Sequence, residues 1–445
     1  MKNLLVAQSG GPTSAINATL AGVVENALSS PSVDRIYGSI NGIQGVLTEN
    51  LIDLKTKLTN VSELDLLCQT PASALGSCRV KLKDPAVCAD EYETIISVLR
   101  KYNIDCFIYI GGNDSMDTVD KLSKYLNAKG ITDITVVGAP KTIDNDLCGT
   151  DHCPGFGSAA KYIGTTFAEL ERDCHVYATK AVTIVEVMGR DAGWLTAASC
   201  LARANGAKGP DFIYLCEVPF SIDTFLKDVK AKLEKQDAVI IAVSEGVKNK
   251  DGRYISEEVQ SSAVDSFGHS YIAGAAKVLE DAVRNEIGCK VRSIELNLMQ
   301  RCAAHLASAT DIQESRMLGK TACQYALEGA TGTMAYYERW AQGPYELRPL
   351  SGWGKEESER PLTMKLPDGL TVALLEAEMV DYARGKFRLS AEKPSTLETS
   401  LYSSVDIISP YSTPWRVIMA AERPVDLINH NDLALNLNTP CLVTY

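Results

Sequence analysis

The stretch CFIYIGGNDS, residues 106–115, carries the pattern that decides the fold. Five apolar residues, Cys106–Ile110, run without interruption, and two glycines and a polar cluster then lead into the amphipathic run Thr118–Ala128. An unbroken apolar run is typical of a strand that is covered on both faces, and a glycine turn commonly opens the following helix. The stretch therefore predicts a buried parallel strand, a tight turn and a helix.

The same pattern recurs on both sides of this stretch. Further strands are expected at Leu4–Ala7, Arg35–Tyr37, Ile134–Val137, Ala181–Val187, Phe212–Leu215, Val239–Val243 and Val291–Leu296. Further helices are expected at Ala15–Leu28, Tyr92–Lys101, Ala159–Arg172, Leu195–Ala204, Ile222–Lys235, Ile272–Glu286 and Ile312–Glu328. Such alternation predicts an α/β protein with mostly parallel sheets and helices on both faces.

A chain of 445 residues is long enough for two or three domains. The strand–helix rhythm weakens after about residue 340, and residues 342–361 are rich in glycine, proline and charge. We expect one domain from residues 1–150 plus about 300–340, a second from 151–299, and a C-terminal extension from 341–445 that packs on the core.

Composition narrows the class of protein. The formal net charge of −12 argues against nucleic acid as a partner, because nucleic-acid-binding proteins usually carry a basic patch. The thirteen cysteines include no C-x-x-C pair, which favours reduced thiols. No apolar run reaches the roughly 18 residues of a membrane span, and the N-terminal run is too short for a signal peptide. We therefore expect a cytoplasmic protein without a membrane segment.

Polar, glycine-rich turns follow five of the expected strands. In open α/β sheets, ligands bind at the carboxyl ends of the strands, so these turns are the candidate ligand site. They are Ser9–Pro12, Gly111–Ser115, Pro140–Asp146, Met188–Gly193 and the position of Glu245.

The first two turns suit a phosphate and a metal ion. Gly10 and Gly11 allow backbone N–H groups to approach a phosphate at a helix N-terminus, although a βα turn without a ligand has the same composition. Asn113 and Asp114 offer oxygen atoms of the kind that Mg²⁺ takes as ligands. The alternative is that Asp114 or Ser115 caps the following helix.

The third and fourth turns suit phosphoryl transfer. Asp144 or Asp146 can take a proton from an attacking hydroxyl while Lys141 balances charge on the moving phosphoryl group. An Asx-turn with an ion pair is the alternative. Arg190, after Gly189, matches the geometry of a phosphate group, although a surface arginine has the same sequence context.

Two other patterns carry less weight. Residues 155–160, GFGSAA, match the dinucleotide-binding spacing but follow TDHCP instead of an apolar strand, so the required context is missing. Cys148 and Cys153 flank His152, which leaves a metal site conceivable beside the simpler interpretation as thiol filler.

Taken in order, six motifs resemble the phosphofructokinase family over roughly residues 1–340. They are GGP (10–12), GGNDS (111–115), PKTIDNDL (140–147), VEVMGRDAGW (185–194), AVSEG (242–246) and MQR (299–301). The stretches GSCRVKLKD (76–84) and TKAVTIVEVMGRDAGWLTAAS (179–199) are most similar to the bacterial pyrophosphate-dependent branch. The resemblance implies two Rossmann-like domains and reversible, Mg²⁺-dependent phosphoryl transfer in glycolysis.

The resemblance also implies residue roles. Asp144 would deprotonate the 1-hydroxyl of fructose 6-phosphate, with Thr142, Ile143 and Asp146 beside the transferring group. The implied catalytic residues are Asp144, Lys141 and Asp114. The implied pyrophosphate-binding residues are Gly10, Gly11, Gly112, Asn113 and Lys141, and the implied metal-binding residues are Asn113 and Asp146. The implied sugar-phosphate residues are Met188, Gly189, Arg190, Glu245, Arg292 and Arg301. Some of these arginines cross a subunit interface in the family, which implies a homodimer or homotetramer.

Asp114 and Lys141 favour pyrophosphate as the donor. ATP-dependent members usually carry glycine in place of Asp114, and a carboxylate there fills the space of the nucleotide α-phosphate and repels it. Lys141 stands where many ATP-dependent members have glycine. The resemblance therefore predicts transfer from pyrophosphate to fructose 6-phosphate.

Three positions depart from the family pattern. Asn113 stands in place of a frequent metal-binding aspartate, Ala181 in place of a phosphate-binding arginine, and Leu298 in place of a sugar-contacting histidine or tyrosine. Leu298 leaves sedoheptulose 7-phosphate open as the acceptor, and the three departures together leave a non-catalytic regulatory subunit open. ATP as the donor is a further alternative, because some ATP-dependent relatives also have a lysine at the place of Lys141.

Overall fold

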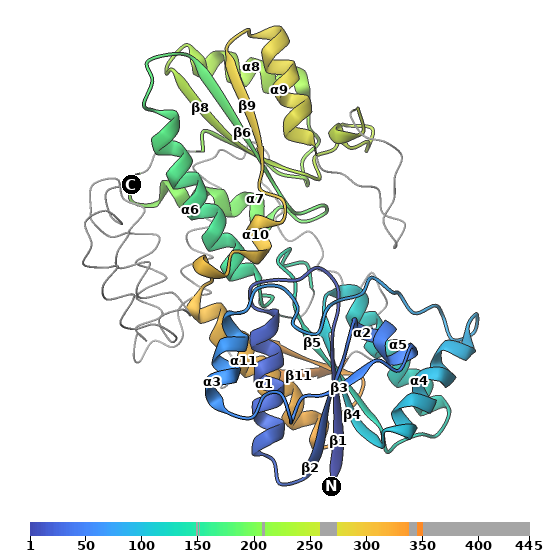
Figure 1. Ribbon diagram of the computed structural model, residues 1–445. Coiled ribbons are helices and arrows are strands. Elements are labelled where there is room, and N and C mark those ends of the chain that lie inside the picture. The colour runs from blue at the N-terminus through green and yellow to red at the C-terminus, as the bar shows by residue number, and fades with distance from the viewer. Residues whose placement is uncertain (148–149, 151, 207–209, 259–273, 338–344, 350–445) are drawn as a thin grey trace. The chain divides into compact units, whose positions relative to one another are not determined.

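The computed structural model describes the whole chain except residues 148–149, 151, 207–209, 259–273, 338–344 and 350–445 (Figure 1). The chain divides into two compact units. Unit 1 contains Met1–Gly157 and Ala309–Pro361, and unit 2 contains Ser158–Ser308.

Unit 1 alternates strands and helices in the way that the apolar runs predict. Its elements are β1 (Lys2–Gln8), α1 (Ile16–Ser29), β2 (Val33–Ser39), α2 (Gly42–Leu47), β3 (Leu51–Asp53), α3 (Val61–Gln69), α4 (Ala89–Lys101), β4 (Ile104–Gly111), α5 (Asn113–Ala128), β5 (Thr135–Pro140), α11 (Ala309–Leu327), β10 (Thr333–Tyr337) and β11 (Tyr345–Pro349).

The sheet of unit 1 has seven strands in the order β11-β10-β5-β4-β1-β2-β3. Its five inner strands run parallel, and β3 and β11 are antiparallel edge strands. In the register, Ala7 lies opposite Tyr109, and Ile110 lies opposite Ala139. The carboxyl ends of β1, β4 and β5 therefore meet at one edge of the sheet, where the first three polar turns begin.

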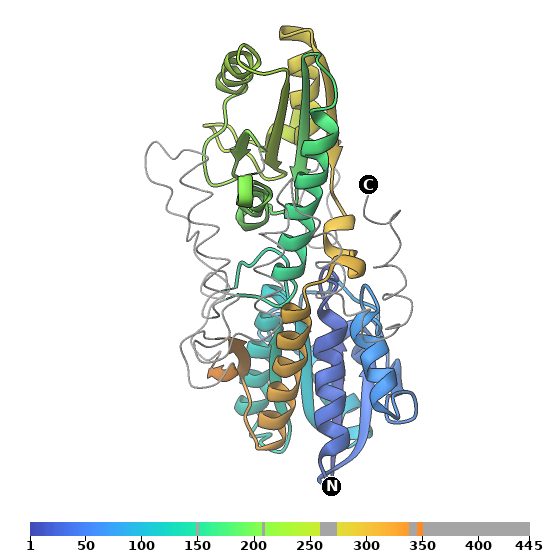
Figure 2. The same cartoon turned by 90° about the vertical axis from the view of Figure 1, so that its left-hand side faces the viewer.

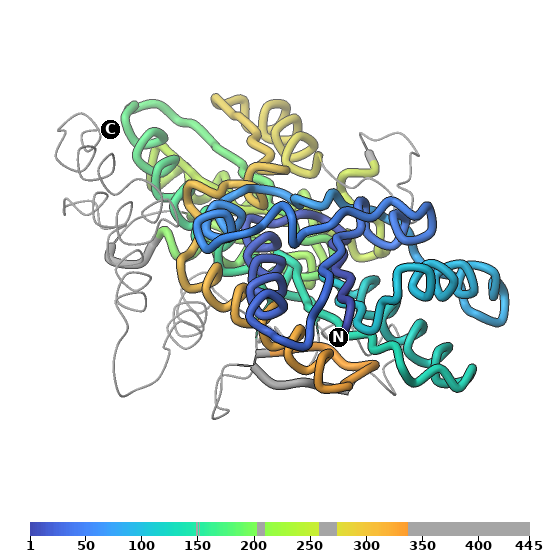
Figure 3. The backbone as a smooth tube through the Cα atoms, turned by 60° about the horizontal axis from the view of Figure 1, so that its bottom comes forward, coloured from blue at the N-terminus to red at the C-terminus, as the bar shows by residue number. Residues whose placement is uncertain are grey.

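Helices cover both faces of this sheet. On one face, α1 and α11, which are far apart in the sequence, run side by side (Figures 2 and 3). A Cβ on Gly22 would collide with the backbone of Arg316, and one on Gly319 would collide with the backbone of Thr19. The two helices approach this closely because glycine stands at both crossing points. On the other face, α2, α4 and α5 bury side chains such as Val46, Leu99 and Leu122 against the sheet.

Unit 2 contains a second, smaller α/β layer structure. Its elements are α6 (Phe156–Cys174, whose first two residues belong to unit 1), β6 (Ala181–Val187), α7 (Trp194–Ala198), the 3₁₀ segment Ser199–Gly206, β7 (Phe212–Tyr214), α8 (Ile222–Leu233), β8 (Ala238–Ser244), the 3₁₀ segment Ile255–Glu258, α9 (Ala275–Glu286), β9 (Lys290–Glu295), α10 (Met299–Cys302) and the 3₁₀ segment Ala304–Leu306.

The four strands of unit 2 are all parallel, in the order β7-β8-β6-β9. Helices α8 and α9 pack on this sheet through residues such as Phe225, Val229 and Leu279. The carboxyl ends of β6 and β8 lie next to each other, since Val187 is paired with Ser244. The fourth polar turn and Glu245 therefore share one edge.

The buried Glu186 fixes the start of α9. Its carboxylate accepts hydrogen bonds from the N–H groups of Gly274 (3.0 Å) and Ala276 (2.8 Å). An acidic group at a helix N-terminus satisfies N–H groups that lack a partner within the helix. Burial, with the nearby Glu295 as a smaller cause, raises the pKa of Glu186 to about 7.

These observations confirm the predicted α/β class, with the expected differences at element ends. The predicted helix Leu195–Ala204 is wrong in part, because the chain tightens to 3₁₀ geometry at Ser199. Helices α2, α3 and α10 and strands β3, β10 and β11 were not predicted. Apart from β11, the predicted extension 341–445 lies outside the described residues. Among the helices that the structure describes, none has the length and apolar composition needed to cross a membrane.

Candidate active site

The turn after β1 is held by the segment Ser77–Cys78. Gly10 has a positive φ of 76°, which glycine adopts without strain. Its N–H donates to the carbonyl of Cys78 (3.2 Å), and the hydroxyl of Ser77 donates to the carbonyl of Gly10 (2.6 Å). The start of the GSCRVKLKD stretch is therefore fixed to the first glycine turn.

Lys141 connects three turns of unit 1. Its side chain is buried, and its ammonium donates to the carbonyl of Gly11, while its backbone N–H donates to the carbonyl of Gly111 (2.8 Å). A Cβ placed on Gly10 would lie 3.4 Å from Lys141 Nζ and 4.0 Å from the nitrogen of Gly112. The structure thus brings together Gly10, Gly11, Gly112 and Lys141 around one buried positive charge, as a site for a polyanion requires in an acidic protein.

Gly112 is the N-cap of α5, and the helix begins at Asn113. The predicted capping by Asp114 or Ser115 is wrong, because both lie inside the first turn. Ser115 instead shares a hydrogen bond of 2.6 Å with the hydroxyl of Ser9, which links the second turn to the first. The positive end of the α5 dipole thus follows directly on the carboxyl end of β4 with glycine at the cap, an arrangement that suits an anion.

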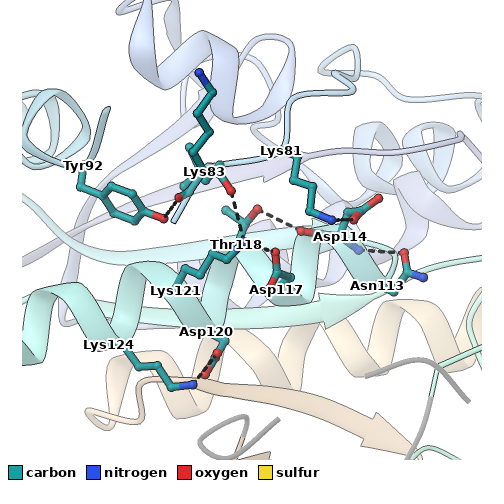
Figure 4. A network of polar contacts seen from close by, with 11 residues as sticks. Lys81, Lys83, Tyr92, Asn113, Asp114, Asp117, Thr118, Asp120, Lys121 and Lys124 are labelled. Atoms are coloured by element: carbon teal, nitrogen blue, oxygen red, sulfur yellow. Dashed lines mark hydrogen bonds and ion pairs between the residues drawn. The ribbon is translucent and has the colours of Figure 1, made fainter. Parts of the chain in front are cut away.

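Asp114 forms an ion pair with Lys81 across 3.2 Å, as Figure 4 shows. Both side chains are partly exposed, Lys81 to 35% and Asp114 to 25%. The backbone N–H of Asp114 donates to Asn113 Oδ1 (2.8 Å), so Asn113 is bonded to the same turn of helix. The carboxylate therefore has a fixed cationic neighbour from a distant part of the chain.

The turn after β5 carries Asp144 and Asp146, both half-buried. The N–H of Asp144 donates to the hydroxyl of Thr142 (3.1 Å), and Asn145, whose φ is 57°, accepts from the N–H of Cys153 through its side chain (2.9 Å). The N–H of Thr142 donates to the carbonyl of Pro154 (3.1 Å). Backbone groups of Cys153 and Pro154 thus brace this turn.

A second layer supports the bracing segment 152–155. The N–H of Gly155 donates to Asp311 Oδ1 (2.9 Å) at the start of α11, and the His152 ring is hydrogen-bonded to the Glu314 carboxylate. A Cβ on Gly155, whose φ is 103°, would collide with Thr13. The helix α11 therefore positions the Asp144 turn from behind. Cys148 of the conceivable metal site lies outside the described residues.

In unit 2, the turns after β6 and β8 are bonded to each other. The N–H of Gly189 donates to Glu245 Oε1 (3.2 Å), and the hydroxyl of Ser244 donates to the carbonyl of Gly189 (2.8 Å). Gly189 has a φ of 128°, and a Cβ on Gly246 would collide with the carbonyl of Arg190. The conformation at Arg190 thus depends on glycine at two positions.

Arg190 is half-buried and has no ion-pair partner among the residues that the structure describes. Its Nε is buried without a hydrogen-bond acceptor, whereas its neighbour Asp191 pairs with Lys248 at 3.1 Å. A buried guanidinium nitrogen without an acceptor is costly unless a ligand supplies one. The arrangement suits a phosphate group on Arg190.

The remaining predicted residues of unit 2 lie on or just after strands β6 and β9. The N–H of Met188 donates to Gln300 Oε1 (3.2 Å) at α10, the helix that also carries Arg301. Arg292 lies on the edge strand β9 and reaches Asp173 at 3.8 Å, and Leu298 is exposed to 54%. The structure thus places Met188 and Arg301 near one helix, and Arg292 on an exposed strand.

Three residues that hold the site together were not predicted from the sequence, namely Lys81, Asp311 and Gln300. Lys81 lies in a stretch that was singled out, but its partner is distant in sequence, so no spacing indicates the pair. Asp311 acts through the backbone of Gly155, and an aspartate that accepts from a distant backbone N–H has no sequence pattern. Gln300 lies within the MQR motif and is buried.

The described residues offer few oxygen ligands for a metal ion at this site. Among the described residues, no three histidine, cysteine, aspartate or glutamate side chains gather in a way that could hold a metal. Mg²⁺ in phosphoryl-transfer sites is usually bound by one or two carboxylates together with substrate phosphates and water. The half-buried Asp144 and Asp146, with the hydroxyl of Thr142, fit that mode of binding.

Comparison with known proteins identifies the family. The Phosphofructokinase family model matches residues 3–326, and a Glycosyl-hydrolase 97 N-terminal model matches residues 316–440, most of which lie outside the described part. A pyrophosphate--fructose 6-phosphate 1-phosphotransferase of Xanthomonas campestris pv. campestris is 40% identical over 83% of this chain and 88% of its own length. A pyrophosphate--fructose 6-phosphate 1-phosphotransferase of Halomonas elongata is 37% identical over 83% of this chain and 88% of its own length. The crystal structure of a pyrophosphate-dependent phosphofructokinase from Marinobacter aquaeolei covers 85% of this chain and 92% of its own, at 34% identity and a TM-score of 0.70. The match over most of the chain shows that this protein belongs to the phosphofructokinase family.

Proposed function

We propose that this protein transfers a phosphoryl group from pyrophosphate to the 1-hydroxyl of fructose 6-phosphate, giving fructose 1,6-bisphosphate and phosphate. The observation that carries the proposal is the donor end of unit 1, where the buried Lys141 lies beside the two glycine turns after β1 and β4, and Asp114 lies in the first turn of α5. The relatives that match over most of the chain carry the name of this activity.

Pyrophosphate is the donor that these residues favour. Gly10, Gly11 and Gly112 have no side chain that would keep a phosphate away from the backbone, and Lys141 adds a full positive charge. Asp114 places a carboxylate in the first turn of α5, and the family resemblance implies that the α-phosphate of a nucleotide would lie there. Bringing two negative groups close in a partly buried site is unfavourable, so the carboxylate selects against ATP.

Asp144 is the proposed general base. It lies in the braced turn after β5, and a positioned carboxylate of this kind takes the proton of the attacking hydroxyl as the phosphorus–oxygen bond forms. Lys141 stabilises charge on the transferring group, while Thr142 and Ile143 shape the turn. Because there is little covalent chemistry for the protein to perform, positioning and electrostatics supply most of the acceleration.

Asp146, with Thr142, would hold Mg²⁺ together with phosphate oxygens and water, since their oxygen atoms fit the ion's preferences. Asn113 is the other proposed contact to the ion. When bound, Mg²⁺ neutralises charge on the phosphates of the donor.

The sugar phosphate is assigned to unit 2. Arg190, whose Nε lacks an acceptor, binds phosphate, and Glu245 binds sugar hydroxyls beside Gly189. Met188 lines the sugar, and Arg292 and Arg301 bind the 6-phosphate. From the family resemblance we also propose a homodimer or homotetramer in the cytoplasm. Arg292 lies on an exposed edge strand, as an arginine that reaches across a subunit interface must.

A donor assay tests this function. Purified protein is mixed with fructose 6-phosphate, Mg²⁺ and either pyrophosphate or ATP, and fructose 1,6-bisphosphate is followed with time. We expect product with pyrophosphate only. Product with ATP only would refute the role of Asp114 and leave the family and Asp144 intact. Product with neither donor would refute the proposed reaction, and sedoheptulose 7-phosphate is then the acceptor to test, because Leu298 departs from the family pattern.

A further inference from the structure

The ion pair between Lys81 and Asp114 reduces the negative charge at the proposed donor site. Asp114 is the carboxylate that excludes a nucleotide, but pyrophosphate is also a polyanion and is repelled by the same charge. The ammonium of Lys81 lies 3.2 Å from Asp114 Oδ1 and offsets that charge. The pair keeps the bulk of the carboxylate while reducing its net negative field.

The backbone holds Lys81 at this place from both sides. On the N-terminal side, Cys78 accepts from the N–H of Gly10 at 3.2 Å. On the C-terminal side, the carbonyl of Leu82 accepts from Lys121 Nζ (3.2 Å), and the carbonyl of Lys83 accepts from the Tyr92 hydroxyl (2.6 Å) (Figure 4). The short segment 78–83 is therefore fixed at both ends.

The same helix anchors both partners of the pair. Asp114 lies in the first turn of α5, and Lys121, which holds the carbonyl of Leu82, lies two turns further along α5, where it also pairs with Asp117 at 2.6 Å. The buried side chains of Leu82 and Tyr92 belong to one hydrophobic cluster with α5. The distance between Lys81 and Asp114 thus depends on a rigid frame instead of on two flexible side chains alone.

We propose that Lys81 is a positioning residue for donor selection, which neutralises the Asp114 carboxylate and holds it at the start of α5 so that an inorganic diphosphate is accepted there while a nucleotide is excluded. The inference rests on the proposed function, because it takes pyrophosphate to be the donor. It differs from direct donor binding: Lys81 acts through Asp114.

The test compares Lys81→Met with Lys81→Arg in steady-state assays at saturating fructose 6-phosphate. Lys81→Met should raise the KM for pyrophosphate about tenfold, the effect expected for one partly exposed charge-assisted contact, and change kcat by less than about threefold. Lys81→Arg keeps the charge and should stay within about threefold of the wild type. Lys124→Met is the matched control, since Lys124 forms a similar ion pair with Asp120 (2.7 Å) on the same helix and should leave KM unchanged.

A double-mutant cycle separates positioning from direct binding. In the Asp114→Gly background, Lys81→Met should change the KM for pyrophosphate by less than about threefold. An equal loss in both backgrounds would show that Lys81 contacts the donor itself and would overturn the inference, as would an unchanged KM in Lys81→Met. Thermal unfolding checks that each variant is folded, and Lys81→Gln replaces Lys81→Met if the latter is not.

Calorimetry with imidodiphosphate, a diphosphate analogue, distinguishes a failure of the inference about Lys81 from a failure of the proposed function. If the wild type binds the analogue and turns over pyrophosphate, and Lys81→Met does both equally well, the inference fails while the proposed function stands. If the wild type neither binds the analogue nor uses pyrophosphate, both fail. Weaker binding by Lys81→Met, recovered in Lys81→Arg, supports both.

Discussion

The N–H of Gly189 donates a hydrogen bond to Glu245 Oε1 over 3.2 Å, which joins the turn after β6 to the turn after β8. The carbonyl of Gly189 in turn accepts from the hydroxyl of Ser244 at 2.8 Å. Arg190, the residue assigned to phosphate, follows directly, and its carbonyl lies against Gly246. The orientation of Arg190 is therefore set by contacts of the backbone, in which its own side chain takes no part.

Gly246→Ala tests this dependence. A Cβ at position 246 would overlap the backbone of Arg190, so we expect the turn to shift, the KM for fructose 6-phosphate to rise about tenfold or more, and stability to fall by about 1–3 kcal/mol. Gly252→Ala is the control, because a Cβ there meets no atom within 4 Å and only the positive φ is unfavourable, at about 1–2 kcal/mol. If both variants lose stability and neither changes KM, the turn does not position Arg190.

Asp144→Asn should abolish most turnover while the protein stays folded. Loss of a general base typically costs about 10²–10⁴-fold in rate, and the amide keeps the size of the side chain. The measurements are kcat with pyrophosphate and the midpoint of thermal unfolding. Asp34→Asn, at the opposite end of the unit 1 strands, is the matched control and should keep full activity. Near-normal turnover in Asp144→Asn would remove Asp144 from the mechanism.

Asp114→Gly should raise the ratio of ATP-dependent to pyrophosphate-dependent kcat/KM by about tenfold or more. The substitution removes both the bulk and the charge that exclude the α-phosphate, and glycine costs roughly 1 kcal/mol or less in the first turn of a helix. The two donors are compared under identical conditions in the same preparation. An unchanged ratio means that the donor is selected elsewhere.

Glu186 predicts a dependence of stability on pH. Burial raises the folded pKa to about 7 from an ordinary value of 4.5, so the folded protein holds a proton that the unfolded chain has released between these pH values. The unfolding free energy should therefore fall as pH rises from about 4.5 to about 7, by about 3 kcal/mol in total from this group.

Denaturant unfolding at pH 5 and at pH 7.5 measures this effect. Glu186→Gln keeps an oxygen for the N–H groups of Gly274 and Ala276 but has no proton to lose, so its stability relative to the wild type should increase with pH. Glu286→Gln, at the exposed end of α9, should show the slope of the wild type. Equal slopes in Glu186→Gln and the wild type would contradict the raised pKa.

Much of the fold was predictable because the signals are local. Residues 106–110 and 239–243 are continuous apolar runs, and such runs indicate a covered strand wherever it is placed in the sheet. The elements that were missed have weak local signals: β3 has three residues, and α2 has six with two glycines among them. Strand β10 is recognisable only from its pairing with β5, through Thr333 and Met334.

The sequence by itself determined the class of fold, the polar turns after strands with Lys141, Asp144 and Arg190 in them, and the likeness to the phosphofructokinase family. These depend on composition and spacing over short windows. The tertiary structure alone decided that Lys141 reaches Gly11, 130 residues away, and that Lys81 pairs with Asp114. The physical reason is that the strand order, β5-β4-β1-β2, differs from the order in sequence, so the partners of each turn are set by the burial of the whole sheet and not by neighbouring residues.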